Sequence, residues 1–264
     1  MTCTRSPRFW SQYRVLPLLL AAPSLAHAEV TNDSFGGPGW WSRPAYDGSD
    51  SRRGELIPVV RYLGEPWFVR TTQDVFEGGM RTQLAPGLHV GAQLAYEAGR
   101  HASESEFLAQ HDVPDVDTGA SIGVHAEWDQ MLGPMPINFL IRARQNIALD
   151  RGAQLDVRLT AGIFRGGPVG MGVFAQATWA NANSTDSLYG ISPQESLTTG
   201  LPAFRPGSGL MNTAYGWLGS IDLSSKWTVT FSLALHRLEG DVAHSPLAER
   251  RTNLYESIGP VYRF

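Results

Sequence analysis

Three consecutive segments of the chain carry acidic and basic residues at alternate positions. These residues are Glu127, Asp129, Arg142, Arg144, Asp156 and Arg158. Successive side chains of a β-strand point to opposite faces, so charges at alternate positions share one face. Neighbouring strands lie about 4.8 Å apart, which allows opposite charges to pair across the ladder. We expect this charge cluster to line the inside of a sheet structure, where it either stiffens the wall or forms a constriction that selects solutes.

Hydrolytic chemistry would need a nucleophile close to a base, and His236 is the candidate base. Ser232 and Ser224 are the conceivable nucleophiles. Ser232 and His236 belong to one expected strand, on which they are separated by roughly 13 Å, too far to share a proton. A hydrogen-bonded, structural His236 is therefore favoured, and no catalytic residue is predicted.

The segment around positions 98–116 concentrates side chains that can bind metals. They are His101, Glu104, Glu106, His111, Asp112, Asp115 and Asp117. Their order fits no known spacing for zinc or calcium sites. We expect a solvated acidic loop, with no metal and no cofactor.

Residues 1–28 have the three parts of a secretory signal peptide. Arg5, Arg8 and Arg14 form a basic start, residues 15–25 are apolar, and residues 26–28 (Ala-His-Ala) supply small side chains for cleavage. The apolar part is shorter than the roughly 20 residues of a spanning helix. We expect cleavage after Ala28, which removes Cys3, the one cysteine of the chain, and leaves residues 29–264 as one domain.

The charge balance excludes one class of partner. The chain has 21 Lys+Arg against 25 Asp+Glu, a formal net charge of −4. A mildly acidic exported protein lacks the basic surface that nucleic-acid binding needs, so no nucleic-acid partner is expected.

Apolar and polar residues alternate along much of the remaining chain. In residues 226–236, Trp227, Val229 and Phe231 alternate with Thr228 and Thr230. No run of 18 apolar residues follows the signal segment, which excludes a helical membrane protein. Alternating segments of about ten residues are typical of strands that cross an outer membrane, with apolar side chains towards lipid and polar side chains towards a lumen. We therefore predict an all-β, antiparallel transmembrane β-barrel in the outer membrane, in contact with outer-membrane lipid.

Twelve such strands can be placed, with ten as the alternative. They are expected near residues 36–44, 54–63, 66–73, 76–84, 87–97, 117–130, 134–147, 152–164, 168–180, 210–223, 226–239 and 253–264. With the amino terminus in the periplasm, the connections 64–65, 85–87, 131–133, 165–167 and 224–225 become short periplasmic turns. The long connections 98–116, 181–209 and 240–252 all fall on the opposite side, as in known outer-membrane barrels.

The chain ends on an aromatic residue. Tyr262 and Phe264 lie on the apolar face of the last expected strand. They resemble the assembly signal by which the barrel insertion machinery of the outer membrane recognises its clients. That machinery is therefore an expected partner.

Several motifs, taken in order, resemble the outer-membrane family named for the MltA-interacting protein MipA and for OmpV. Near the start stands 44–50 (Pro-Ala-Tyr-Asp-Gly-Ser-Asp), and in the middle 132–136 (Leu-Gly-Pro-Met-Pro). The others are 189–192 (Tyr-Gly-Ile-Ser), 200–204 (Gly-Leu-Pro-Ala-Phe), 240–241 (Gly-Asp), 245–246 (Ser-Pro) and 262–264 (Tyr-Arg-Phe). Trp40 and Trp41 depart from the pattern, because the family has small residues there.

The resemblance implies a non-enzymatic scaffold that brings a lytic transglycosylase and a penicillin-binding protein together at the peptidoglycan, or else a surface protein. Because the expected periplasmic turns are short, residues 29–38 are the expected contact segment for such enzymes. The residues themselves leave two alternatives: a narrow small-solute channel, which the charge cluster favours, and an outer-membrane lipid hydrolase that would use His236.

Overall fold

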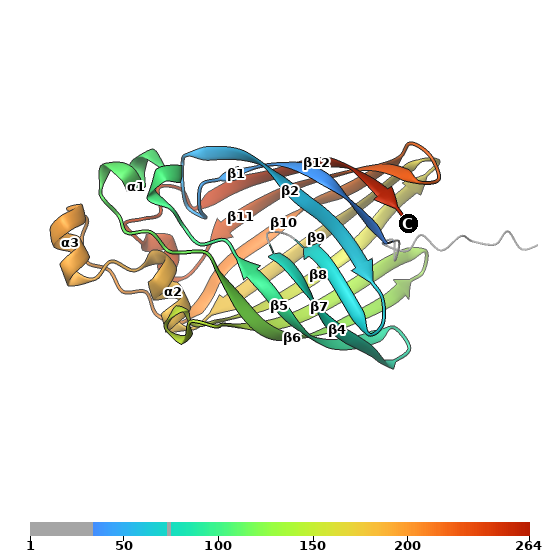
Figure 1. Cartoon of the computed structure of the whole chain (residues 1–264), viewed down its shortest axis with the longest axis horizontal. Helices are drawn as coiled ribbons and strands as arrows, with labels where there is room; N and C mark the ends of the chain where they lie inside the picture. Colours follow the sequence, from blue (N-terminus) through green and yellow to red (C-terminus); the bar gives the residue numbers. More distant parts are fainter. Residues whose placement is uncertain (1–33, 73–74) are drawn as a thin grey trace, which may run out of the picture.

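Twelve β-strands form one closed antiparallel barrel in the computed structural model, which describes residues 34–72 and 75–264 (Figure 1). The expected signal peptide, residues 1–28, lies outside the described residues. The strands are β1 (Phe35–Pro44), β2 (Arg52–Leu63), β3 (Trp67–Thr72), β4 (Val75–Ala85), β5 (Leu88–Glu97), β6 (Gly119–Leu132), β7 (Met135–Asn146), β8 (Ala153–Gly166), β9 (Val169–Ala180), β10 (Gly209–Asp222), β11 (Trp227–Leu238) and β12 (Thr252–Arg263).

Each strand pairs with its neighbours in the sequence, and β1 pairs with β12 to close the barrel. The prediction of twelve antiparallel strands is confirmed, and every predicted boundary lies within two residues of the observed one. Closure matters in a membrane, because lipid offers no hydrogen-bond partners to the backbone of an open sheet edge.

Apolar side chains lie outside the barrel and polar side chains lie inside. Along β11, Trp227 and Leu233 are 48% and 44% exposed, whereas Thr228 and His236 are buried. Ile258 on the neighbouring β12 is also exposed. This arrangement is the inverse of a soluble domain, and it suits a barrel whose outer surface is covered by hydrocarbon.

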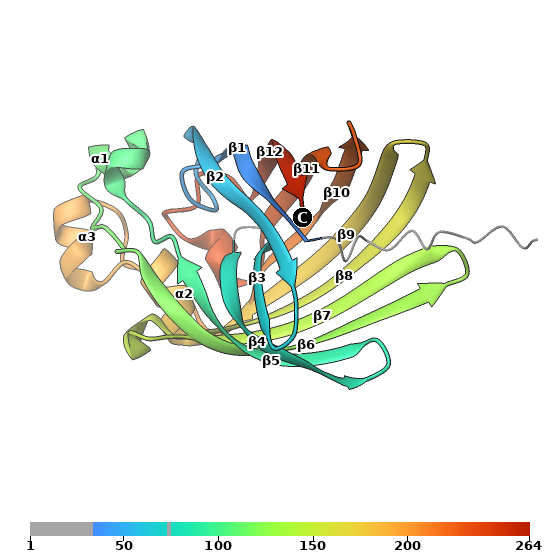
Figure 2. The same ribbon diagram turned by 45° about the vertical axis from the view of Figure 1, so that its right-hand side comes forward.

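The connections differ between the two ends of the barrel (Figures 1 and 2). One end, called here the short-turn end, carries the tight connections that follow β2, β4, β6, β8 and β10. Gly133 and Gly167 in two of these turns have φ angles of 62° and 55°, which side chains with a Cβ rarely adopt. The other end, the long-loop end, carries the long connections that the sequence predicts.

The long connections fold together into a cap over the long-loop end, made of residues 45–51, 98–118, 147–152, 181–208 and 239–251. It contains η1 (Ala102–Glu104), α1 (Glu106–Gln110), η2 (Leu149–Arg151), α2 (Ala182–Tyr189), α3 (Pro193–Thr199) and η3 (Asp241–His244). Tyr46, Leu108, Ile191 and Leu247, each from a different loop, pack in one buried apolar cluster. No helix in the described part of the chain is long and apolar enough to cross a membrane.

Candidate functional site

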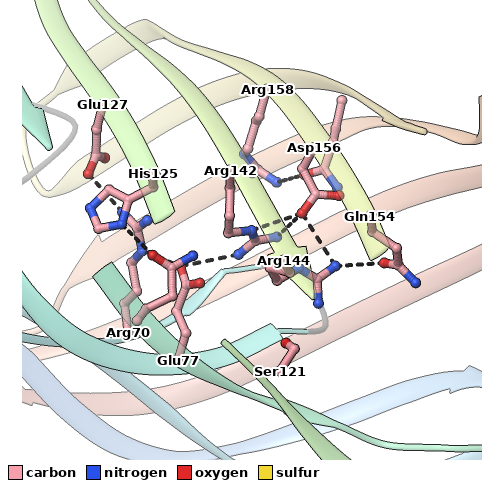
Figure 3. Close-up of polar contacts among 12 residues, drawn as sticks. Arg70, Glu77, Ser121, His125, Glu127, Arg142, Arg144, Gln154, Asp156 and Arg158 are labelled. Carbon is pink, nitrogen blue, oxygen red and sulfur yellow. Dashed lines mark hydrogen bonds and ion pairs between the residues drawn. The ribbon is translucent and has the colours of Figure 1, made fainter. Parts of the chain in front are cut away.

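Arg142 on β7 lies at the centre of an ion-pair network inside the barrel (Figure 3). Its Nε and Nη2 atoms each lie 2.8 Å from Oδ2 of Asp156 on β8, and its Nη1 lies 3.1 Å from Oε1 of Glu77 on β4. Arg144, two positions further along β7, contacts Asp156 at 3.3 Å and Glu97 on β5 at 2.8 Å. The contacts with Asp156 join neighbouring strands, whereas those with Glu77 and Glu97 join strands that are not neighbours in the sheet.

Arg70 on β3 extends the network in the other direction. Its Nε lies 2.7 Å from Oε1 of Glu77, and its Nη1 lies 2.8 Å from Oε2 of Glu127 on β6. The network therefore connects strands β3 to β8, half of the barrel wall. We call it the lumen network; its members are Arg70, Glu77, Glu97, Glu127, Arg142, Arg144 and Asp156.

The lumen network is buried. The side chains of Arg142 and Glu77 are 1% and 0% exposed, although both point into the lumen. Removing a charge from water costs several kcal/mol per ion, and close pairing with good hydrogen bonds offsets that cost. The lumen is thus filled by paired side chains at this level.

The same network braces the part of the wall that has the shortest ladder. The described ladder between β2 and β3 joins three residue pairs, whereas the one between β10 and β11 joins eleven. Arg70 on β3 is anchored to Glu127 on β6, and Arg81 on β4 donates a hydrogen bond of 2.8 Å to the carbonyl of Leu63 at the end of β2. Side chains thus hold β3 and β4 in the wall where backbone pairing is short.

Four of the six residues of the predicted charge cluster belong to the lumen network, and two lie elsewhere. Asp129 lies nearer the short-turn end, where it accepts a hydrogen bond of 2.8 Å from Nδ2 of Asn138. The guanidinium of Arg158 lies 4.0 Å from the centre of the Phe174 ring and donates to Oγ1 of Thr160 at 3.2 Å. Both side chains still face the lumen. Asp129 lies towards the opening at the short-turn end, and Arg158 points towards Phe174 on β9.

Sequence reasoning missed Arg70, Glu77 and Glu97. Glu77 carried a usable signal, because it stands between outward-facing Phe76 and Gly78 in an alternating segment. Arg70 lies in β3, which has six residues. Such a short segment gives too few alternations to assign the face of a charge.

A cluster of apolar and aromatic side chains lies inside the opposite half of the barrel. Phe174 on β9, Ala214 on β10, Ala234 on β11 and Tyr255 on β12 form a buried cluster against which Trp41 on β1 packs. The interior therefore carries the lumen network over β3–β8 and, over β9–β1, this apolar cluster together with buried polar residues such as Asn212, Thr228 and Asn253.

The candidate hydrolytic residues are not arranged as a catalytic pair. The hydroxyl of Ser232 lies 2.7 Å from that of Ser257 on β12. Ser224 lies in the turn before β11, at the other end of that strand from His236. The His236 ring stacks on Tyr255 with their centres 4.0 Å apart, and its Nδ1 lies 3.7 Å from Oδ1 of Asp47.

The acidic residues of the loop before β6 have separate structural partners. Asp115 accepts a hydrogen bond of 2.7 Å from the backbone N–H of Ala102, and this bond lowers the pKa of Asp115. Glu104 pairs with Arg53 on β2. Glu106 accepts a hydrogen bond of 2.9 Å from Gln110, one helical turn away. In the described ranges, no three His, Cys, Asp or Glu side chains gather as they would around a metal ion.

Five of the motifs that carry the family resemblance come together in the cap, although they are far apart in the sequence; the other two, residues 132–136 and 262–264, lie at the short-turn end. The hydroxyl of Tyr46 donates to the carbonyl of Leu247 at 2.8 Å, and that of Ser245 donates to the carbonyl of Tyr189 at 2.7 Å. Ile191 forms a backbone bridge with Phe204. Burial raises the pKa of both Tyr46 and Tyr189, so both remain neutral hydrogen-bonding groups at physiological pH.

Asp47 connects the cap to the barrel. Its carboxylate accepts a hydrogen bond from the Tyr255 hydroxyl on β12 and lies beside His236 on β11. Burial alone would raise the pKa of Asp47, but the hydrogen bonds from His236 and Tyr255, with the charge of His236, hold it below its usual 3.8. Next to it, Nδ2 of Asn253 donates to the carbonyl of Ser49 at 2.7 Å.

Comparisons with known proteins agree with this architecture. A family model described as MltA-interacting protein MipA matches residues 37–264, which confirms the resemblance of the motifs. The chain is similar in fold to an outer membrane channel from Pseudomonas putida F1, with 10% identity, 88% of this chain and 95% of that chain covered, and a TM-score of 0.50. It also matches LpxR from Salmonella typhimurium, with 9% identity, 86% and 100% coverage, and a TM-score of 0.45. No curated protein sequence matches. At such identities the solved structures show the fold alone.

Proposed function

Because the chain belongs to the MltA-interacting protein MipA family, we propose that it is a non-enzymatic outer-membrane scaffold for peptidoglycan-remodelling enzymes, a lytic transglycosylase and a penicillin-binding protein. The lumen charge cluster, Glu127, Asp129, Arg142, Arg144, Asp156 and Arg158, then serves as a lining that stiffens the wall. Residues 1–28 direct export and are removed, and the mature barrel comprises residues 29–264.

One observation supports a scaffold over a pore: paired charges fill the lumen. The guanidinium of Arg142 is 1% exposed and is held by Asp156 and Glu77. The cap adds a second obstruction at the long-loop end, where Leu247 is fully buried among residues of three other loops. A barrel filled in this way acts through its surfaces.

The contact surface for wall enzymes would be the short-turn end. Both the start of β1 and the end of β12 lie there, since Phe35 pairs with Arg263. In the proposed orientation this end faces the periplasm, and the cap faces the cell exterior. The turns themselves are small, so the residues that precede β1 would share in the contact.

Site-specific photocrosslinking in living cells tests the scaffold. A photoreactive amino acid replaces Pro168 in the turn between β8 and β9, and Leu197 on the exposed face of α3 serves as the matched control. We expect adducts with a lytic transglycosylase and a penicillin-binding protein from position 168 and none from position 197. If position 168 of the folded protein gave no adducts with wall enzymes, the proposal would be contradicted. Adducts from position 197 alone, with molecules outside the cell, would favour a surface protein.

A narrow channel is the second candidate, favoured by the charged lining of β3–β8. Planar-bilayer recording distinguishes the two functions. A scaffold with a filled lumen is electrically silent, and the double variant Arg142→Ala, Arg144→Ala gains conductance because its plug is reduced. Steady conductance of the unaltered protein, with ion selectivity that changes in this variant, would establish the channel instead.

The absence of enzymatic activity is a separate part of the proposal. His236, the candidate base, is engaged with Asp47 and Tyr255 at the junction with the cap. Incubation of the purified barrel with phospholipid and lipid A is expected to give no hydrolysis. Hydrolysis that His236→Ala abolishes would identify a lipid hydrolase.

A further inference from the structure

The outer face of the barrel is hollowed over strands β3 to β9. The groove has a volume of about 1300 Å³. Its lining includes Trp67, Met80, Ala92, Val124, Leu155 and Trp179. All these side chains point away from the lumen, and Trp67 and Trp179 are 61% and 40% exposed. We call this feature the outer groove.

The outer groove follows the hydrogen-bond direction of the sheet. Trp67 on β3 pairs with Met80 on β4, and the same row continues strand by strand to Leu155 on β8, which pairs with Trp179 on β9. Six steps of about 4.8 Å give the row a length of ~29 Å. Trp67 is the first residue of β3 at the short-turn end, and Trp179 is next to last in β9 at the long-loop end.

Small side chains make the groove deep. Within the row, Ala92 and Ala143 separate the larger residues, and Gly78 lies in the adjacent outward-facing row. Between the two rows, the backbone of residues such as Gly79 and Gly123 forms the floor. A larger residue at either alanine would fill the groove from within.

The lumen network fixes the floor of the groove from behind. Arg144 is one of the floor residues, and its side chain points inwards to Glu97 at 2.8 Å and to Oε1 of Gln154 at 2.8 Å. Oε1 of Gln93, another floor residue, accepts a hydrogen bond of 2.5 Å from Nδ1 of His125. The hollow is therefore a feature of a braced wall, present before any occupant arrives.

The position of the groove determines which molecules meet it. It is continuous with the apolar belt that the barrel presents to lipid, and a tryptophan stands at each end, where interfacial aromatic residues are expected. Polar lining residues such as Asn181 and Ser208 lie at the long-loop end of the groove. Its length is comparable to the hydrocarbon core of about 30 Å, to which each leaflet contributes about half, so hydrocarbon chains from both leaflets can together lie along it.

We propose that the outer groove is an acyl-chain site, which holds hydrocarbon chains of membrane lipid longer than the rest of the barrel surface does. Freely moving lipids would pack poorly against this concave wall and leave voids, in which dispersion contacts are lost. Ordered chains in the groove fill these voids. The inference is independent of the scaffold function, since it concerns the lipid-facing wall and not the turns that would contact wall enzymes.

Electron spin resonance tests this site on the complete barrel in vesicles that contain phosphatidylglycerol spin-labelled near the chain terminus. Ala143→Phe and Ala92→Phe fill the groove. Ala175→Phe adds the same ring to an exposed outward position on β9 outside the groove and is the matched control. Retained heat-modifiable mobility on gels shows that each variant is folded. A variant that fails to fold is replaced by Ala143→Leu.

The expected result is a smaller fraction of motionally restricted lipid per protein in both groove variants, with the control unchanged. Native mass spectrometry from detergent should show the same loss as fewer retained lipid adducts. Equal restricted fractions in all variants would overturn the proposal. A change of oligomeric mass in the groove variants without a change in restricted lipid would also overturn it, because the groove would then be a protein interface.

Discussion

Arg142 and Glu77 contact each other at 3.1 Å although two whole strands, β5 and β6, separate their strands in the sheet. The wall of this barrel is therefore held by side chains that cross the lumen as well as by backbone ladders. Arg70 and Glu127 repeat the relationship between β3 and β6 at 2.8 Å. The two contacts tie β3 and β4, which lie beside the short ladder between β2 and β3, to β6 and β7.

Removing one charge of this brace should destabilise the barrel strongly. Glu77→Gln preserves size but leaves Arg142 and Arg70 each with one acid fewer. We expect a loss of about 3–5 kcal/mol in the free energy of unfolding, because a buried charge is left without full compensation. Chemical denaturation of the refolded barrel in detergent micelles measures it.

An exposed ion pair provides the control for that experiment. Asp50, in the cap segment after β1, lies 2.5 Å from Arg250, and its side chain is 54% exposed. Asp50→Asn should cost less than about 1 kcal/mol, as solvent-exposed pairs do. Equal costs at Glu77 and Asp50 would mean that the lumen network contributes nothing beyond a surface pair.

The cap should loosen when its central hydroxyl is removed. Tyr46→Phe deletes the hydrogen bond to the Leu247 carbonyl and leaves that buried oxygen with one donor fewer. The expected cost is about 0.5–1.5 kcal/mol, localised to the cap. This loss of stability should appear as faster proteolytic cleavage within residues 98–118 and 181–208. Tyr215→Phe on the outer face is the control and should leave the cleavage rate unchanged. If the Tyr46 variant were cleaved no faster than the unaltered protein, the hydrogen bond from Tyr46 to Leu247 would not hold the cap together.

Acid should weaken the attachment of the cap to the barrel through Asp47. Its pKa is below 3.8 in the folded state, so the charged carboxylate contributes stability at pH values above 3.8. That contribution is lost as the pH falls through the lowered pKa. Cap proteolysis by an acid-stable protease should therefore accelerate below pH 3.8. Asp47→Asn should show the faster cleavage already at pH 5, and a variant with the unaltered pH profile would contradict the assignment to Asp47.

The strands could be predicted from the sequence because their signal is local. Alternation along β11 places Phe231 outside and Ser232 inside without knowledge of any other strand. The lumen network needed more than alternation. Whether Arg142 meets Glu77 depends on how strands three places apart curve towards each other, and no pattern within one segment contains that curvature.

The cap shows the same limit. Ser192 and Glu195 form a capping box with Pro193 at the start of α3, a recognisable local signal. The contact of Tyr46 with Leu247 is not local, because it joins the first and last loops through the closure of β1 onto β12. The same closure explains the unusual Trp41, whose ring lies 6.0 Å from that of Tyr255 inside the barrel, while Trp40 is outside and 51% exposed.

The terminal aromatic residue should matter for assembly in cells more than for stability. Phe264 is 71% exposed at the end of the chain, so Phe264→Ala removes little packing. We expect less barrel in the outer-membrane fraction of cells that express this variant, with refolding in detergent unchanged. Trp217→Ala, on the outer face of β10, is the comparison. Normal insertion of the Phe264 variant would contradict the assembly role that we expect for Tyr262 and Phe264.

The orientation of side chains along β11 tests the whole account most directly. In a background without Cys3, single cysteines at positions 229 to 233 carry a fluorescent label in vesicles of brominated phospholipid. We predict strong quenching at Val229, Phe231 and Leu233 and weak quenching at Thr230 and Ser232, because the first set faces lipid and the second faces the lumen. Equal quenching at all five positions, or strong quenching at the second set alone, would contradict a barrel with an apolar exterior and a polar, filled interior.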